Sequence, residues 1–400
     1  MRFLCLFFLV FAEQSFSMTF SDAVKKIKNH KKVQVLQLES ERLKALASLK
    51  GAWDDPVLKL ALKNLPQESL AKDESAMSGT EIAIEQKIPL SPYKSRSKEA
   101  YRFMASGKSW SAKGKQDQMI GHLWMMLIKI RGMKEELVIL KDNLTWVKKM
   151  LNVAQRLYTK GRKSQQGVLD LKIRRTELVN QIDNKTLDLE EAYHHIHYSV
   201  GSSNAILIED KTIPWVIFTR NGAQLDKRYK ELQAMAKGQK LQASAKSWSR
   251  APDIKLSLAY TKKEFEGLDD QVSMGVSVPL PLFSKSRDDY RAARLQAQKA
   301  QLDLEDYEID KAARNHELEL AISKINSELK SIENESIRYA ENSRQITAKS
   351  YEIGDASYAE LLQAELRLQK LKLRRIMLRT KFLNQSLKKK LLNGEPLYES

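Results

Sequence analysis

Four short stretches of the chain alternate apolar and polar residues with a period of two, as β-strands with one apolar face do. They lie at 56–64, 80–90, 252–262 and 270–280. Fifteen positions fall on the apolar faces and none is charged, although 30% of the residues in the chain are charged. Apart from Gln86 and Tyr260, these positions are Leu58, Leu60, Leu62, Ile82, Ile84, Ile88, Ile254, Leu256, Leu258, Val272, Met274, Val276 and Val278.

Two long stretches without proline predict long helices. The nine prolines leave 93–213 and 282–395 free of this residue, and a proline inside a helix costs about 3 kcal/mol. Apolar residues recur there at three- and four-residue steps, the spacing of an amphipathic helix. We expect helices at 19–50, 94–158, 165–199, 223–250, 285–350 and 355–393.

The second half of the chain repeats the first. VSMGVSVPLPLFSKSR at 272–287 matches IAIEQKIPLSPYKSR at 82–96 in its alternation, its prolines and its basic end. Two breaks in the long helices also correspond, because Tyr158 and Gly161 recur as Tyr351 and Gly354. Glycine favours the position after a helix end, so the breaks predict hairpin tips near 158–167 and 351–358.

The repeat predicts how the whole chain is organised. A first repeat covers 18–200, with a helical hairpin at 94–199, and a second covers 223–394, with a hairpin at 285–393. Residues 201–222 link the two repeats, and 395–400 form a C-terminal tail. The predicted fold class is mainly α with a small β part, built from two strand–strand–helical-hairpin halves.

The first residues have the pattern of a cleaved secretory signal at 1–17. Arg2 precedes an apolar run from Phe3 to Ala12, and small residues follow at Ser15 and Ser17. The only cysteine, Cys5, lies in this segment, so we expect no disulfide in the exported protein. The net charge of +18 is spread along the chain, which favours solvated helix faces over a nucleic-acid site.

An exported chain with uncharged strand faces fits an outer-membrane β-barrel, in which a lipid-facing Lys or Arg costs about 2–4 kcal/mol at the midplane. Aromatic residues flank the strands, where interfacial side chains would lie: Trp53, Tyr93, Tyr260, Phe265 and Phe283. A soluble, half-buried sheet alternates in the same way and is the alternative. Four strands would leave open edges in lipid, so the membrane interpretation requires more than one copy of the chain.

The duplicated halves, the YxxG tips and the Leu-rich helices after them resemble TolC-type outer membrane factors over essentially the whole mature chain. Three segments look closer to the heavy-metal cation efflux (CzcC-type) branch: DPVLKLALKNLP (55–66), QKIPLSPYKSR (86–96) and APDIKLSLAYTKKE (251–264). The resemblance implies a homotrimer whose twelve strands close one barrel in the outer membrane. A long α-helical barrel would continue it through the periplasm.

The resemblance also implies roles for the tips. They would dock a periplasmic adaptor that joins the duct to an inner-membrane pump. Glu360 falls where a gating acid is common, whereas Gln363 and Gly167 stand where the family often has acids. Glu360 and Gln363 are therefore the candidate gate. The basic residues of the first tip indicate a different gate or adaptor: Lys160, Arg162 and Lys163.

The sequence contains no catalytic constellation, so we expect no enzyme activity and no cofactor. His194 and His197 are weak candidate metal ligands that could share a helix face, and a solvated helix end is the favoured alternative. The seven-residue repeat of Gly107, Gly114 and Gly121 predicts a face where helices approach closely. Trp124 with its two following methionines predicts core.

These patterns predict a passive exit duct of a tripartite efflux system, located in the outer membrane of a Gram-negative bacterium and extending into the periplasm. Heavy-metal cations are one candidate cargo. A secreted polypeptide, as in type I secretion, or a drug is an alternative cargo. An exported coiled-coil scaffold or adaptor without a barrel is the alternative from another functional class.

Overall fold

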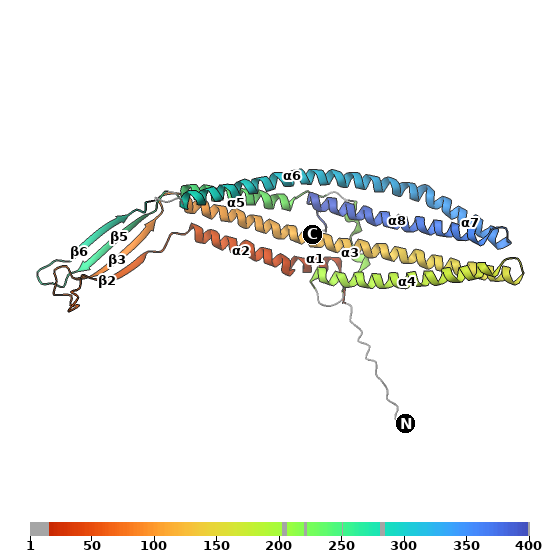
Figure 1. The fold of residues 1–400 in the computed structure, drawn as a ribbon, viewed down its shortest axis with the longest axis horizontal. Helices are drawn as coiled ribbons and strands as arrows, with labels where there is room; N and C mark the ends of the chain where they lie inside the picture. The colour runs from red at the N-terminus through yellow and green to blue at the C-terminus, as the bar shows by residue number, and fades with distance from the viewer. Residues whose placement is uncertain (1–15, 202–205, 220–221, 250, 281–284, 399–400) are drawn as a thin grey trace, which may run out of the picture. The chain divides into compact units, whose positions relative to one another are not determined.

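The computed structural model describes residues 16–201, 206–219, 222–249, 251–280 and 285–398. Most of these are helical, with one four-stranded sheet and one two-stranded pair (Figure 1). The predicted fold class is confirmed: mainly α, with a small β part, and two strand–strand–helical-hairpin halves. The chain divides into two compact units, one made of residues up to Gln34, Lys113–Asp226 and Asp310 onward, the other of Val35–Ala112 and Lys227–Ile309. Each unit takes segments from both predicted repeats, whose boundaries stay a prediction.

The four-stranded sheet belongs to the second of these units. Its order is β2 (Val57–Lys63), β3 (Gly79–Ile88), β5 (Ile254–Lys262) and β6 (Gln271–Ser277), and all neighbours are antiparallel. Each strand overlaps a stretch predicted from alternation. The register keeps the period of two across the sheet, since Leu60 pairs with Ile82, Ile82 with Tyr260, and Tyr260 with Val272. Each face therefore continues over all four strands.

The helices of this unit are most of α2 (Lys31–Gly51), the first part of α3 (Tyr93–Thr159), α5 (Lys227–Trp248) and the first part of α6 (Lys285–Ser331). Helices α3 and α5 approach closely: a Cβ added at Gly107 would lie 3.1 Å from the Cγ of Met235. One added at Gly238 would lie 3.0 Å from the carbonyl oxygen of Ala100. The close approach predicted at Gly107 is confirmed.

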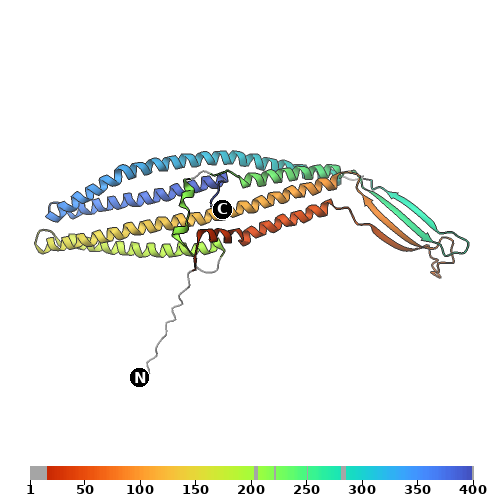
Figure 2. The same cartoon turned by 180° about the vertical axis from the view of Figure 1, so that it is seen from behind.

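The other unit contains two helical hairpins. One pairs the rest of α3 with α4 (Gln165–Val200), and the other pairs α7 (Ile337–Ile353) with α8 (Tyr358–Asn393), as both views show (Figures 1 and 2). Trp124 is fully buried, as predicted, with its ring centroid 4.9 Å from that of Phe20. Its indole N–H donates to the carbonyl of Leu397 at 2.8 Å. Part of the predicted C-terminal tail is thus packed into this core, since Leu397 is buried.

The predicted link at 201–222 contains short elements of its own. Strand β4 (Ile206–Ile208) pairs in parallel with β1 (Phe16–Met18), and 3-10 turns follow at Asp210–Thr212 and Trp215–Phe218. Most of the predicted signal, including Cys5, lies outside the described residues, as does Phe283. The signal and its cleavage stay a prediction.

The helix expected at 19–50 is interrupted, so its predicted continuity was wrong. It breaks between α1 (Phe20–Lys28) and α2, where the Asn29 N–H donates to the Lys26 carbonyl at 3.1 Å and His30 Nδ1 accepts from the Lys32 N–H at 3.1 Å. This break contains neither the glycine nor the proline that usually indicates a helix end in a sequence. The helix expected at 285–350 is continuous, with a π-helical turn at Ile332–Ser336 between α6 and α7.

Candidate functional site

One face of the four-stranded sheet is apolar and exposed. Met274 is 85% exposed and Leu60 70%. Ile88 and Ile254 are half-buried, and the other predicted lipid-facing residues are exposed: Leu58, Leu60, Leu62, Ile82, Ile84, Leu256, Leu258, Val272, Met274, Val276 and Val278. Soluble monomers rarely expose contiguous apolar patches of more than a few hundred Å², and larger ones mark contact with lipid or protein.

The edges of the same unit are open. Among the described strands none pairs with the outer side of β2 or of β6, so both present unpaired N–H and C=O groups. The helices carry exposed apolar stripes as well. Leu295, Leu302 and Ile309 follow one another at seven-residue steps on α6, and Val35, Leu38 and Leu49 are exposed on α2. Seven-residue spacing is typical of a seam between packed helices.

The opposite face of the sheet is polar and ion-paired. The Glu85 carboxylate pairs with the ammonium groups of Lys59 and Lys255, the latter at 2.8 Å. Glu81 pairs with Lys63. Apart from Lys262, which pairs with Thr80 at the end of β5 and so lies on the apolar side, the sheet separates an uncharged face from a charged one, as the alternation predicts.

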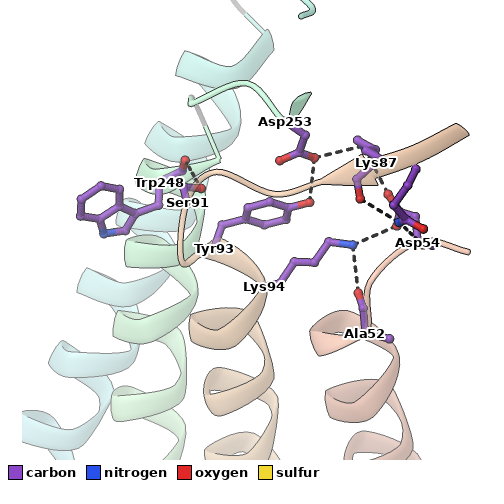
Figure 3. Close-up of polar contacts among 9 residues, drawn as sticks. Ala52, Asp54, Lys87, Ser91, Tyr93, Lys94, Trp248 and Asp253 are labelled. Atoms are coloured by element: carbon purple, nitrogen blue, oxygen red, sulfur yellow. Dashed lines mark hydrogen bonds and ion pairs between the residues drawn. The ribbon is translucent and has the colours of Figure 1, made fainter. Parts of the chain in front are cut away.

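A polar network joins the strands to the helices (Figure 3). Lys94 Nζ lies 2.9 Å from Asp54 Oδ1, and Lys87 Nζ lies 3.5 Å from Asp54 Oδ2 and 3.1 Å from Asp253 Oδ2. The hydroxyl of Tyr93 donates to the same Asp253 oxygen at 3.1 Å. These residues come from the end of β3, the start of α3 and the segments before β2 and β5. The network therefore fixes the connections between strands and helices.

The charges of this junction support each other. The hydrogen bond from Lys94 holds the pKa of Asp54 below its usual value. Burial raises the pKa of the Tyr93 hydroxyl, so this group stays a neutral donor. Tyr93 was predicted among the interfacial aromatic residues, but its hydroxyl belongs to this network (Figure 3).

The two predicted tips have the same backbone geometry. Gly161 and Gly354 both take left-handed conformations, with φ of 67° and 96°. The Arg162 N–H donates to the Leu157 carbonyl and the Asp355 N–H to the Ser350 carbonyl, each at 2.9 Å. This is a glycine-terminated helix end, in which a residue with a Cβ would be strained.

The tyrosines of the two tips lie in different environments. Tyr351 is 1% exposed and Tyr158 is 45% exposed. Tyr351 packs against the first hairpin, where a Cβ added at Gly167 would lie 3.5 Å from its hydroxyl oxygen. Lys163 Nζ also donates to the carbonyl of Ala356 at 3.0 Å. The tips of one chain thus pack against each other and cover one tyrosine only.

The predicted gate residues lie beside the second tip. Glu360 forms a capping box with Ser357, whose backbone N–H donates to the Glu360 carboxylate at 2.7 Å. This hydrogen bond lowers the pKa of Glu360. Gln363 is exposed. In a single chain Glu360 therefore caps α8, and a gating role for the two residues stays a prediction.

A buried ionic cluster between the hairpins was missed from the sequence. Glu365 is 1% exposed, with the Arg344 guanidinium 3.3 Å from its Oε2, and its Oε1 has no hydrogen-bond partner among the described residues. Nearby, Arg174 of α4 donates to Gln369 of α8. Burial raises the pKa of Glu365, with Arg344 opposing the shift. One sequence pattern could have predicted the burial of Glu365: it shares a helical stripe with Leu361 and Leu368, which are buried.

The histidine cluster carries no defined metal set. The rings of His194 and His197 are 6.1 Å apart and nearly perpendicular, and His195 Nε2 lies 3.6 Å from Glu191 Oε1. Within the described ranges, no group of three or more His, Cys, Asp or Glu side chains could hold a metal ion. No described helix combines the length and the apolar character that crossing a bilayer requires.

The second half of the sequence matches a known protein-family model. Residues 225–389 match the family model of outer membrane efflux proteins. This match covers α5, the strands β5 and β6 and most of the second hairpin. The heavy-metal branch stays a prediction. A search among curated proteins gives no match.

Solved structures share the fold along nearly the full length of the chain. The outer membrane protein VceC from Vibrio cholerae superposes with a TM-score of 0.77 at 11% identity, covering 94% of this chain and 96% of its own. The outer-membrane channel OprN gives 0.76 at 14% identity, with 94% and 90% covered. The Campylobacter jejuni outer membrane channel CmeC gives 0.71 at 12% identity, with 95% and 87% covered. The chain therefore has the fold of these outer membrane proteins.

Proposed function

We propose that the chain is the protomer of an outer-membrane exit duct, which conducts substrate passively from the periplasm to the exterior. The exposed apolar face of the sheet carries this proposal. In water each fully exposed Leu, Val, Ile or Met side chain forgoes about 1.5–3 kcal/mol of burial. Lipid would cover the face without breaking a hydrogen bond, because the backbone groups of the inner strands are already paired.

The open edges favour a closed homotrimer. Pairing β6 of one copy with β2 of the next repeats the antiparallel pattern, and a repeated head-to-tail contact gives a ring when the rotation between copies closes. The exposed stripe of α6 would meet that of α2 in the neighbouring copy. Three copies give the twelve strands of the TolC-type arrangement, and the similarity to solved outer membrane channels supports this number.

The helical hairpins would extend into the periplasm, where the tips dock an adaptor that connects to an inner-membrane pump. Tyr158, Gly161, Tyr351 and Gly354 form the docking surface in this proposal, and Glu360 with Gln363 the gate. Tyr158 supports it, because its exposed ring leaves a surface that a second copy or an adaptor can cover. Heavy-metal cations, drugs and secreted polypeptides are candidate cargoes.

Two arginine substitutions, one on each face of β6, test the membrane location. Met274 and Ser273 are neighbours on this strand and point to opposite faces, and both are exposed. Met274→Arg places a charge in lipid, at a cost of about 2–4 kcal/mol per copy if it lies near the midplane. We expect it to remove most of the protein from the outer-membrane fraction and to prevent assembly of the proposed trimer.

Ser273→Arg is the matched control, with the same new charge on the polar face of the same strand, and it should assemble. If both variants fractionate like the parent protein, the apolar face does not contact lipid. If the parent protein and both variants are folded and are recovered in the soluble fraction, the result would instead support the coiled-coil scaffold.

A further inference from the structure

The polar face of the sheet has more positive than negative groups. The strands place four lysines on it, Lys59, Lys63, Lys87 and Lys255, against two glutamates, Glu81 and Glu85. The other positions of this face are small or uncharged, as at Ala83, Ala259, Ser273 and Gly275. Because no larger side chain stands between them, the lysines are the longest groups that rise from the face.

The charges are also layered. The side chains of Glu81 and Glu85 are each 13% exposed, whereas those of the four lysines are 45–50% exposed. Glu85 lies between Lys59 and Lys255, and Glu81 against Lys63. An ion that approaches the face therefore meets ammonium groups first and the carboxylates behind them.

The neighbouring acids do not reverse this excess. At the junction Asp54 and Asp253 pair with Lys87 and Lys94 (Figure 3), and Asp55 follows Asp54, so the face and the junction together have five lysines and five carboxylates, with the lysine excess confined to the face. Further acids lie in the two loops that connect the strands, outside the face: Glu68, Asp73, Glu74, Glu264, Glu266, Asp269 and Asp270. Of these, Asp270 is bonded to Tyr260 and to the Lys263 N–H.

We propose that this lysine face is an anion-preferring lining of the duct, and that the cargo class is anionic, with carboxylate or phosphate groups, rather than free metal cations. This rests on the proposed function, because only closure of the sheet turns the face into the wall of a channel. Lysine and arginine rings select anions in pores, since the low dielectric of the wall strengthens their field.

Reversal potentials in planar bilayers test the proposal. Full-length protein purified from outer membranes is reconstituted under a potassium chloride gradient, and the ratio of chloride to potassium permeability is measured. Lys59→Gln and Lys255→Gln, alone and together, should shift the reversal potential toward potassium. Glu85→Gln should shift it toward chloride, because it removes the carboxylate beneath the two ammonium groups.

Lys25→Gln is the matched control. It removes an ion-paired lysine of α1, whose Nζ lies 3.3 Å from Asp22, and it should leave the reversal potential unchanged. If the channel conducts but the Lys59, Lys255 and Glu85 variants give the parent value, the lysine face does not select ions, while the duct itself stands. If no conductance and no outer-membrane oligomer are found, the duct fails, and the inference fails with it.

Discussion

At the scale of single residues, Glu365 shows how α7 and α8 are held together inside the second hairpin. A carboxylate with 1% exposure loses its hydration, and Arg344 restores only part of that loss. The cluster therefore joins α7 and α8 at a cost in stability. Its value would lie in fixing one packing of the hairpins, with Arg174 and Gln369 beside it.

The raised pKa of Glu365 predicts a pH dependence of stability. Between the ordinary value of 4.5 and the raised value, the folded protein binds more protons at this site than the unfolded chain. The free energy of unfolding should thus be highest below that window and decrease as the pH rises through it. Glu365→Gln should remove this decrease, which thermal unfolding in detergent at several pH values would measure.

Glu352→Gln, at an exposed position of α7, is the control and should keep the pH dependence of the parent protein. An unchanged pH profile in Glu365→Gln would mean that the buried carboxylate is not the group responsible.

At the scale of elements, the two tips differ in how their second helix begins. Ser357 and Ser164 are equivalent N-cap residues, but only the Ser357 side chain accepts a hydrogen bond, from the Glu360 N–H at 3.2 Å. Position 167, equivalent to 360, is glycine, so a capping box cannot form in the first tip.

Ser357→Ala should therefore destabilise the first turn of α8 by about 1 kcal/mol. Hydrogen exchange of the Glu360 amide should then become roughly fivefold faster. Ser164→Ala should change exchange at the start of α4 little. Equal effects at both tips would contradict the assignment of Glu360 as a helix cap in the assembled protein.

The elements also show what a sequence can predict. Alternation located all four strands and their uncharged face, and the recurring Tyr and Gly located both tips, because these signals are local. The junction required Asp54, Lys94 and Asp253 to converge from distant segments, and β1 pairs with β4 across most of one half. Glu365 was missed because a carboxylate in an apolar stripe is buried only when folding brings Arg344 of α7 beside it.

At the scale of the whole molecule, one chain leaves several apolar surfaces and strand edges uncovered. The apolar sheet face, the edges β2 and β6 and the stripes on α2 and α6 all belong to one compact unit. Lipid would cover the first, and neighbouring copies the others. If the lysine face lines the resulting channel, its charge disfavours free metal cations as cargo.

The most direct test of this account is the native mass of the protein extracted from outer membranes in mild detergent. Closure of the open edges predicts a particle of three chains, stable against dilution and present in the outer-membrane fraction. A monodisperse single chain, or a protein recovered only in the soluble fraction, would contradict the central claim that three copies close one duct.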